Sequence, residues 1–272
     1  MRPLADKFGR AINYLRISVT DRCNLRCAYC MPAEGIALKT HAEILSYEEI
    51  VEICKTAVGL GINKIRLTGG EPLVRRDICE LVFGIANIPG LQDLALTTNG
   101  VHLKALAFNL KKAGLRRVNV SLDSLDPAKY QRITRGGNLS DVLQGIEAAL
   151  AAGLAPLKIN IVLQWGFNDD EVEAFMSFAD RLGVKLQFIR QMSLSRGKPA
   201  VPADNVCTRP PDCRQCNRVR LTADGKFKPC LFSDLEIDVR IVGAERALRL
   251  AVESKPEAGR ACYKREMVQI GG

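Results

Sequence analysis

The chain has 272 residues, of which 47% are hydrophobic and 25% are charged, a composition typical of a globular protein with one barrel or two small domains. No run of residues is apolar enough for a signal peptide or a membrane span, so a soluble cytoplasmic protein is expected. The net charge of +9 is scattered along the chain and does not by itself indicate nucleic-acid binding, since a small anionic substrate would also benefit from it.

Apolar strand-like runs alternate with amphipathic helical runs over the first two thirds of the chain. Strands are expected at Leu15–Val19, Lys64–Thr68, Asp93–Thr97, Arg117–Leu122, Leu157–Leu163 and Lys185–Ile189. Helices are expected near Tyr47–Gly59, Asp77–Asn87, Leu103–Ala113, Asp141–Ala152 and Asp170–Leu182. Six such units in series predict an α/β fold with a parallel sheet. Because eight units close a full barrel, six favour a partial (β/α)6 TIM-like barrel, with a doubly wound sheet as the alternative.

The chain changes character after Met192. The next residues are rich in Pro, Arg and Ser, and a cysteine-rich segment and a charged tail follow. We therefore divide the chain into a barrel (1–192), a linker (193–212) and a C-terminal extension (213–272) that ends in two glycines.

Three of the ten cysteines lie on one loop after the first expected strand, with the spacing C-x3-C-x2-C: Cys23, Cys27 and Cys30. In a reducing compartment, clustered cysteines indicate metal binding more often than disulfides. Three thiolates can hold three irons of a [4Fe–4S] cluster and leave the fourth iron without a protein ligand. A zinc knuckle is the alternative, which this spacing and the lack of a nearby fourth ligand disfavour.

The segment Gly69-Gly70-Glu71-Pro72 follows the second expected strand. Glycine lets the backbone approach a ligand closely, and a carboxylate suits an ammonium partner. Together with the C-x3-C-x-aromatic-C loop, this segment resembles the radical S-adenosylmethionine superfamily. The resemblance implies that S-adenosylmethionine chelates the open iron and that its reductive cleavage gives a 5′-deoxyadenosyl radical, which abstracts hydrogen from the substrate.

A second cysteine group has the spacing C-x2-C-x13-C: Cys213, Cys216 and Cys230. From the residues alone, two interpretations of this group remain open. The three cysteines hold either a second iron–sulfur cluster with a vacant position or a zinc ion whose fourth ligand is Cys207 or Cys262.

The dipeptide Asp224-Gly225 lies within this second group and predicts a hairpin between two short strands. Arg218 and Arg220 are two residues apart on the first of these strands and should project to the same side. Arginine forks suit a triphosphate, although ordinary surface charge is the alternative.

Long runs of the chain resemble the GTP 3′,8-cyclase family of molybdenum-cofactor biosynthesis. These runs are FGRAINYLRISVTDRCNLRCAYCMP, RLTGGEPLVRRD, TTNG, LRRVNVSLDSL, CNRVRLTADGKFKPCLF and the terminal Gly-Gly. The resemblance implies two [4Fe–4S] clusters, S-adenosylmethionine, GTP as substrate and an electron donor of the flavodoxin or ferredoxin type. It implies no nucleic acid or membrane partner, and a homodimer is compatible with it. The implied reaction abstracts hydrogen from C3′ of GTP, and the ribose radical attacks C8 to give (8S)-3′,8-cyclo-7,8-dihydro-GTP.

The resemblance also assigns site residues. The first cluster would be held by Cys23, Cys27 and Cys30, and the second by Cys213, Cys216 and Cys230. S-adenosylmethionine would be contacted by Tyr29, Gly70, Glu71, Ser121 and Met192. GTP would be bound by Arg16, Arg66, Thr97, Lys158, Arg218 and Arg220, the last two also acting in catalysis. The Gly-Gly tail would enter the active site.

Three features depart from the family pattern. Twenty residues separate Met192 from Cys213, where the family has a longer insert; Gln187 and Arg190 stand where it tends to have Arg and Glu; and Cys207 is an additional thiol. These departures leave open a diverged paralogue acting on another nucleotide. A radical maturase of a peptide or protein, or a non-catalytic metal-binding or nucleic-acid-binding module, are the remaining hypotheses. The arginine pair and the Gly-Gly tail argue against the maturase, and the open cysteine loop argues against the module.

Overall fold

The computed structural model describes residues 4–195, 207 and 212–271. Its barrel strands are β1 (Tyr14–Ser18), β2 (Lys64–Thr68), β3 (Asp93–Thr98), β4 (Arg117–Ser121), β5 (Lys158–Leu163) and β6 (Lys185–Arg190). The helices between them are α1 (Tyr47–Gly59), α2 (Ile78–Ala86), α3 (Leu103–Lys112), α4 (Pro127–Thr134), α5 (Leu139–Ala151) and α6 (Val172–Leu182), with short 3-10 turns η1 (Pro72–Val74) and η2 (Asp169–Glu171). The predicted linker, 193–212, lies mostly outside the described residues.

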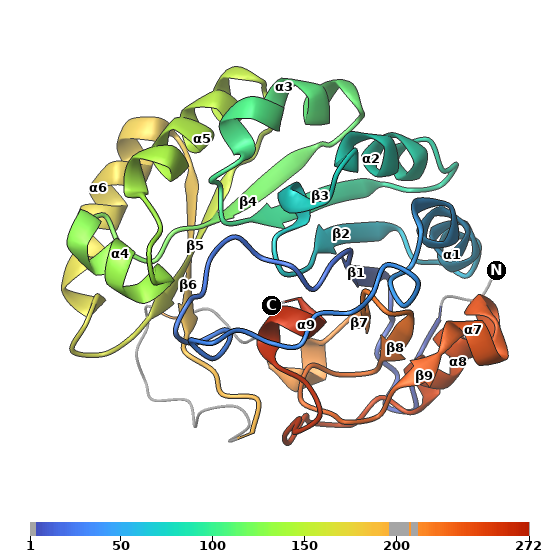
Figure 1. The fold of residues 1–272 in the computed structure, drawn as a ribbon. Coiled ribbons are helices and arrows are strands. Elements are labelled where there is room, and N and C mark those ends of the chain that lie inside the picture. The colour runs from blue at the N-terminus through green and yellow to red at the C-terminus, as the bar shows by residue number, and fades with distance from the viewer. Residues whose placement is uncertain (1–3, 196–206, 208–211, 272) are drawn as a thin grey trace.

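The strands of the barrel pair in parallel and in chain order, β6-β5-β4-β3-β2-β1. This order confirms the predicted partial barrel and excludes a doubly wound sheet, in which the strand order reverses at a switch point. The helices form an outer arc around the curved sheet, and the inner face of the sheet looks toward the C-terminal segment (Figure 1). Because successive side chains of a strand point to opposite faces of the sheet, every second side chain of each barrel strand faces this interior.

The C-terminal extension continues the same sheet. Its elements are η3 (Cys213–Gln215), β7 (Arg218–Leu221), β8 (Lys226–Lys228), β9 (Ile237–Asp238), α7 (Val239–Val242), α8 (Ala244–Glu253) and α9 (Met267–Ile270). Strand β7 pairs in parallel with β1, and β8 and β9 add to it in antiparallel order. The expected hairpin is confirmed, with Gly225 in its turn at φ +78°. The interior of the barrel is thus bounded on one side by residues of the extension.

Local sequence signals explain most of the helix ends. Ser46 caps α1 in a reciprocal capping box with Glu49, which satisfies two backbone amides at the helix start. Helix α6 ends at Gly183, whose φ of +66° suits a glycine. The apolar faces of these helices pack against the sheet in one main core, which also contains Phe227 of β8 and Leu248 of α8.

Helix α4 was not expected from the sequence. Its eight residues carry little apolar periodicity, and Tyr130 and Ile133 are its large buried apolar side chains. The signal that could have found it is the pair Asp126-Pro127: the Asp126 carboxylate accepts hydrogen bonds from two amides of the first turn, and proline favours the first helical position. The end of this helix accepts hydrogen bonds from the first cysteine loop, so the helix that the sequence did not predict is part of the support of the candidate site.

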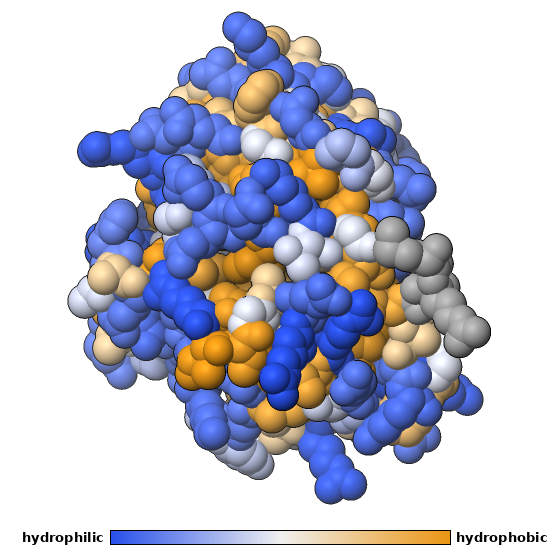
Figure 2. Space-filling view, turned by 90° about the vertical axis from the view of Figure 1, so that its right-hand side faces the viewer, coloured by the Kyte–Doolittle hydropathy of each residue, from blue (hydrophilic) through white to orange (hydrophobic). Residues whose placement is uncertain are grey.

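The surface is mixed in character. Figure 2 shows the side on which α1, α7 and α8 lie, where apolar residues appear between hydrophilic ones. Among the described residues, none of the helices has the length and hydropathy that crossing a membrane requires.

A substitution at Phe227 of β8 tests whether the C-terminal extension and the barrel unfold together as one core. The Phe227 side chain is fully buried, so Phe227→Ala should lower the free energy of unfolding of the chain by about 3–5 kcal/mol in a urea titration. The control is Phe83→Ala on α2, where the ring is 62% exposed and a change within about 0.5 kcal/mol is expected. A small effect of Phe227→Ala, or a separate early transition, would contradict a shared core.

Candidate functional site

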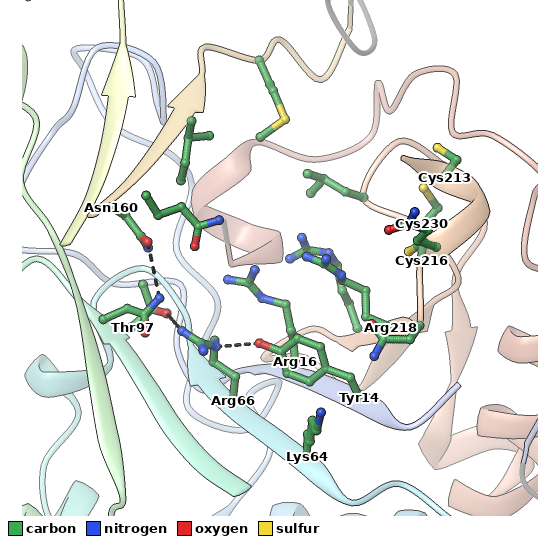
Figure 3. Close-up of a pocket in the computed structure, with 18 of the residues that line it drawn as sticks. Tyr14, Arg16, Lys64, Arg66, Thr97, Asn160, Cys213, Cys216, Arg218 and Cys230 are labelled. Carbon is green, nitrogen blue, oxygen red and sulfur yellow. Dashed lines mark hydrogen bonds between the residues drawn. The ribbon is translucent and has the colours of Figure 1, made fainter. Parts of the chain in front are cut away.

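The interior of the partial barrel holds a cavity of about 540 Å³. It is lined by alternate residues of β1 to β7, by Met192 beyond β6, and by residues of the extension. The predicted GTP-binding residues all line it: Arg16, Arg66, Thr97, Lys158, Arg218 and Arg220. Figure 3 shows four of them, Arg16, Arg66, Thr97 and Arg218, in one space with the second cysteine group at its edge.

Strand register brings the arginines together. Arg16 of β1 is paired with Arg66 of β2 on one side and with Arg220 of β7 on the other. Tyr14, two residues earlier, is flanked in the same way by Lys64 and Arg218. Residues paired across parallel strands point to the same face of the sheet, so five basic side chains converge on the cavity.

The crowding of these basic groups affects their protonation. Removal from bulk water, and after it the charge of Arg218, lower the pKa of Arg220 to about 10. The pKa of Arg16 is held well below its usual value, first by desolvation and then by Arg220. A site with this much positive charge in low-dielectric surroundings is poised to bind an anion.

Tyr14 contacts two of the arginines and is a site residue that was not predicted from the sequence. Its hydroxyl accepts a hydrogen bond of 2.6 Å from Nε of Arg66, and the Arg218 guanidinium lies 5.8 Å from the centre of its ring. Burial raises the pKa of Tyr14, but the charges of Arg66, Arg16 and Arg218 together bring it below its usual value. Arg66 also donates to Thr97 Oγ1 at 3.1 Å (Figure 3). A tyrosine two residues before Arg16 on the same strand face was the signal available.

Nε of Arg218 and Oδ1 of Asn119, in the cavity wall, are inaccessible to water and have no hydrogen-bond partner among the described residues. Asn119 contacts Asn160 through its other amide atom, at 3.3 Å. Buried polar atoms of this kind are normally satisfied, so their state fits a polar ligand in the cavity.

The second cysteine group borders the same cavity. Cys213, Cys216 and Cys230 lie close together at its edge (Figure 3). Behind them the buried Lys255 donates to the carbonyl oxygens of Arg218 and Pro229, at 2.7 and 2.8 Å. Desolvation raises the pKa of Cys216, but Lys255 and Arg218 bring it below its usual value. The donor set is three thiols with cationic neighbours, which fits a negatively charged thiolate–iron unit.

The first cysteine group lies on a loop that follows β1. The amides of Arg26 and Ala28 donate to the carbonyls of Thr134 and Ile133 at the end of α4. The Gly-Gly-Glu-Pro turn packs on its other side: the amide of Gly70 donates to Thr20 and that of Glu71 to Arg22. A Cβ atom at Gly70 would overlap the Arg22 carbonyl, so glycine is required by close approach.

Burial raises the pKa of all three thiols in this loop, and that of Cys30 to about 12. Three thiolates side by side are therefore disfavoured unless a cation neutralises them, which an iron cluster does. Within the described residues, no three His, Cys, Asp or Glu side chains are arranged around a single metal ion. A cubane differs from such a site, because each thiolate binds its own iron.

Glu71 has a position that the sequence did not indicate. Its side chain is buried and accepts hydrogen bonds from Leu73 N, Thr98 Oγ1 and Asn99 N at 2.6–3.0 Å. Burial raises the pKa of this carboxyl to about 7. Asn99 in turn contacts Asn24 of the cysteine loop at 2.7 Å. Glu71 thus ties the ends of β2 and β3 to the loop.

Two further predicted cofactor residues lie near the first cysteine group. The hydroxyl of Tyr29 donates to Asp123 at 2.6 Å, and burial raises the pKa of Asp123 to about 6. Tyr29 and Met192 line a second cavity of about 320 Å³ beside the loop. Met192 also lines the large cavity, so the two spaces meet at its side chain. Ser121 ends β4, with its side chain partly exposed.

The C-terminal tail reaches the same region. Gly271 is buried, its carbonyl oxygen accepts a hydrogen bond from the Arg220 guanidinium, and a Cβ atom there would overlap Thr68 Oγ1. The last described residue therefore touches both the wall of the large cavity and the start of the Gly-Gly-Glu-Pro turn. Gly272 lies outside the described residues.

The two cysteine groups lie at opposite ends of the barrel interior. Cys23 follows the C-terminal end of β1, whereas Cys216 precedes the N-terminal end of β7, and these two strands are parallel. A five-residue strand spans about 13 Å. A ligand between the groups would therefore lie along the row of arginines.

The fit of the Gly-Gly-Glu-Pro turn against the cysteine loop is testable at Gly70. Gly70→Ala places a methyl group on a backbone oxygen that cannot rotate away, so the free energy of unfolding should fall by about 1–3 kcal/mol. Iron bound per chain after anoxic reconstitution should fall as well.

Gly59→Ala is the control for this variant, because no atom lies within 4 Å of its added methyl and alanine suits the end of α1. Equal stability and iron content in the two variants would show that the turn and the loop are not closely packed.

Two family models match the chain: Radical SAM superfamily over residues 17–179, and Molybdenum Cofactor Synthesis C over residues 207–257. SuiB of Streptococcus suis, solved with S-adenosylmethionine, superposes with a TM-score of 0.66 at 13% sequence identity. The superposition covers 92% of this chain and just under two thirds, 66%, of SuiB, and at this identity it establishes the fold alone.

Close relatives match over nearly the whole chain. The GTP 3′,8-cyclase of Moorella thermoacetica is 47% identical over 279 residues, covering 87% of this chain and 86% of that protein. The GTP 3′,8-cyclase of Alkaliphilus oremlandii is 43% identical over 320 residues, covering 99% of this chain and 100% of that protein. This alignment is longer than the 272 residues of the chain, so that relative carries residues that the chain lacks. The chain belongs to the GTP 3′,8-cyclase family of the radical S-adenosylmethionine superfamily.

Proposed function

We propose that this protein is a radical S-adenosylmethionine lyase that cyclises GTP to (8S)-3′,8-cyclo-7,8-dihydro-GTP in molybdenum-cofactor biosynthesis. The observation that carries the proposal is the row of arginines on β2, β1 and β7 between two open groups of three cysteines. Relatives that are 43–47% identical have the same activity in their names. Membership of the superfamily implies a [4Fe–4S] cluster and S-adenosylmethionine.

The first cysteine group is proposed to hold the cluster that binds S-adenosylmethionine. Cys23, Cys27 and Cys30 would each ligate one iron. The close approach of Gly70 to the cysteine loop supports a backbone contact of the Gly-Gly-Glu-Pro turn with the methionine part of the cofactor. Because its carboxylate accepts three hydrogen bonds from the protein, Glu71 would hold this turn in place as well as lie near the cofactor.

Three other residues would position the rest of the cofactor. Tyr29 and Met192 share the second cavity beside the cysteine loop, and Ser121 ends the neighbouring strand β4. When bound, the cluster and S-adenosylmethionine would supply the radical chemistry that removes the hydrogen from C3′ of GTP. The residues around the site contribute position, orientation and the exclusion of water.

The second cysteine group is proposed to hold a second [4Fe–4S] cluster, ligated by Cys213, Cys216 and Cys230, whose open iron faces the guanine end of GTP. The cluster would lie at the edge of the large cavity, beside the unpartnered Nε of Arg218. The triphosphate would be bound by the basic and polar residues of the cavity, Arg16, Arg66, Thr97, Lys158, Arg218 and Arg220. Guanidinium forks match phosphate oxygens, and their crowded positive charges would be neutralised by the ligand.

An apolar cluster lies against both cysteine groups. Leu231, Phe232, Met267 and Ile270 belong to one buried cluster, against which Cys30, Met192 and Cys230 pack. One apolar cluster therefore contacts both cysteine groups. A dry surrounding protects a carbon radical from side reactions.

The proposed reaction also needs a source of electrons. The electron would come from a donor of the flavodoxin or ferredoxin type, and the protein would act alone or as a homodimer.

An anoxic assay tests the proposed reaction. Reconstituted protein with S-adenosylmethionine, a reductant and GTP should release 5′-deoxyadenosine and form the 3′,8-cyclised nucleotide in equal amounts. Consumption of another nucleotide in place of GTP would indicate a diverged paralogue, which Gln187 in the cavity wall allows. Release of 5′-deoxyadenosine without consumption of any nucleotide would favour a peptide maturase. No cleavage of S-adenosylmethionine would refute the proposal.

The same assay includes Arg218→Ala. Loss of a hydrogen-bonded charge costs about 1.5–3 kcal/mol, so the Kd for GTP should rise about 10- to 100-fold while S-adenosylmethionine cleavage stays measurable. Arg249→Ala is the control, since Arg249 pairs with Glu245 on the exposed face of α8. Unchanged GTP affinity in Arg218→Ala would count against the nucleotide site.

Metal analysis distinguishes the two proposals for the second cysteine group. About eight irons per chain are expected if both groups hold [4Fe–4S] clusters. Cys216→Ala should lower the content to about four and leave the first cluster intact. About four irons with one zinc in the unaltered protein would remove the second cluster and leave the first.

A further inference from the structure

An ionic cluster lies at the start of the C-terminal tail, where Arg265 also borders the second cavity. The Arg265 guanidinium donates to Glu236 Oε1 and Oε2, both at 2.8 Å, and to Asp224 Oδ2 at 2.9 Å. Lys228 Nζ contacts the same Glu236 at 3.1 Å. The side chains of Arg265, Asp224, Glu236 and Lys228 are 10%, 9%, 19% and 0% exposed, so the four form a shielded, charge-balanced set. Ion pairs shielded to this degree fix geometry far better than exposed ones.

The members of this cluster come from three parts of the site. Asp224 is in the turn of the β7–β8 hairpin, four residues after Arg220, and Thr222 Oγ1 donates to it at 2.6 Å. Lys39, in the segment after the first cysteine group, lies 3.9 Å from the same carboxylate, and its amide donates to Asp21 at 2.6 Å. Arg265 belongs to the tail. Asp224 is therefore a common anchor for the cysteine loop, the arginine hairpin and the tail.

The tail is short between Arg265 and Gly271, the last described residue. The amide of Glu266 donates to Gln269 Oε1 at 2.9 Å just before α9, which runs from Met267 to Ile270. Gly271 follows, where its carbonyl oxygen accepts from Arg220 and its α-carbon packs against Thr68 and Gly69. One helical turn thus connects a fixed arginine to the residue that touches the cavity wall. Moving Arg265 would move Gly271.

We propose that Arg265, clamped between Asp224 and Glu236, is a positioning residue that sets where the C-terminal tail meets Arg220 and the Gly-Gly-Glu-Pro turn. It acts through Gly271: its guanidinium is held by Asp224 and Glu236, while the residue also borders the second cavity beside the first cysteine loop. The expected effect on the reaction rests on the proposed function. The expected effect on the position of the tail rests only on the contacts described above. With the clamp released, α9 loses its outer anchor, and the Arg220 guanidinium loses a fixed acceptor. Hydrogen abstraction and cyclisation should then become less well coupled.

The test compares Arg265→Gln with Lys226→Gln in the reconstituted protein. Lys226 pairs with Asp238 on the same part of the sheet, and no contact of its side chain with the tail is present among the described residues. In Arg265→Gln, backbone amides of residues 267–271 should exchange hydrogen at least about tenfold faster, while the amides of β1 to β6 stay unchanged. The ratio of 5′-deoxyadenosine released to GTP cyclised should rise above that of the unaltered protein. Lys226→Gln should change neither quantity.

Two further variants separate positioning from a general loss of structure. Arg265→Lys keeps the charge but reaches fewer carboxylate oxygens, so its exchange rates and product ratio should lie between those of the unaltered protein and Arg265→Gln. Gly271→Ala disturbs the tail directly. If Arg265 acts through the tail, adding Arg265→Gln to Gly271→Ala should change the product ratio by less than twofold.

Three results would overturn the proposal: unchanged exchange in residues 267–271, no recovery in Arg265→Lys, or effects of the two single changes that multiply in the double variant. The exchange measurement needs no GTP turnover. A protein that fails to cyclise GTP but shows the expected exchange would refute the proposed function and leave the positioning role standing.

Discussion

The parallel pairing of β1 with β2 on one side and β7 on the other is the constraint on which the site depends. It places Arg66, Arg16 and Arg220 side by side, although they are 50 and 204 residues apart along the chain. It also sends the cysteine loop after β1 and the cysteine group before β7 to opposite ends of the same interior. One hydrogen-bonded register therefore sets both the charge of the cavity and the direction of the ligand in it.

Such a concentration of positive charge is unfavourable in isolation. The lowered pKa values of Arg16 and Arg220 express this cost, since burial and like charges both disfavour the protonated guanidinium. The fold tolerates it because the apolar core on the other face of the sheet stabilises the strands that carry these residues. An anionic ligand then gains from charges that are already held in place, so less rearrangement is needed on binding.

The extension contributes as much to the site as the barrel does. Strand β7 supplies two arginines, the hairpin supplies Asp224, and the tail brings Gly271 to the edge of the cavity. Hydrogen bonds and ion pairs between these parts form a continuous set from Asp21 in the cysteine loop, through Lys39 and Asp224, to Arg265. The segment after β1 and the C-terminal tail are thereby held against the same interior, with the two cysteine groups on either side.

The sequence by itself determined the elements whose signals are local. Capping residues and apolar periodicity predicted six strands and five helices to within a few residues, and Asp224-Gly225 predicted the hairpin, because these depend on neighbours in the chain. Cysteine spacing and the Gly-Gly-Glu-Pro segment indicated the chemistry for the same reason. Helix α4 was missed, since its stability comes mainly from packing of a few side chains such as Tyr130.

Tertiary structure alone decided which distant residues share the site. The role of Tyr14 depends on the approach of Arg66 and Arg218, the many protein contacts of Glu71 depend on how β2 and β3 end together, and the clamp on Arg265 depends on the packing of the tail. The spacing of Tyr14 and Arg16 indicates a shared strand face, but it does not predict which distant residues Tyr14 contacts, and no spacing predicts the contacts of Glu71 and Arg265. They arise from strand register and from the burial of charge, which exist only once the chain has folded.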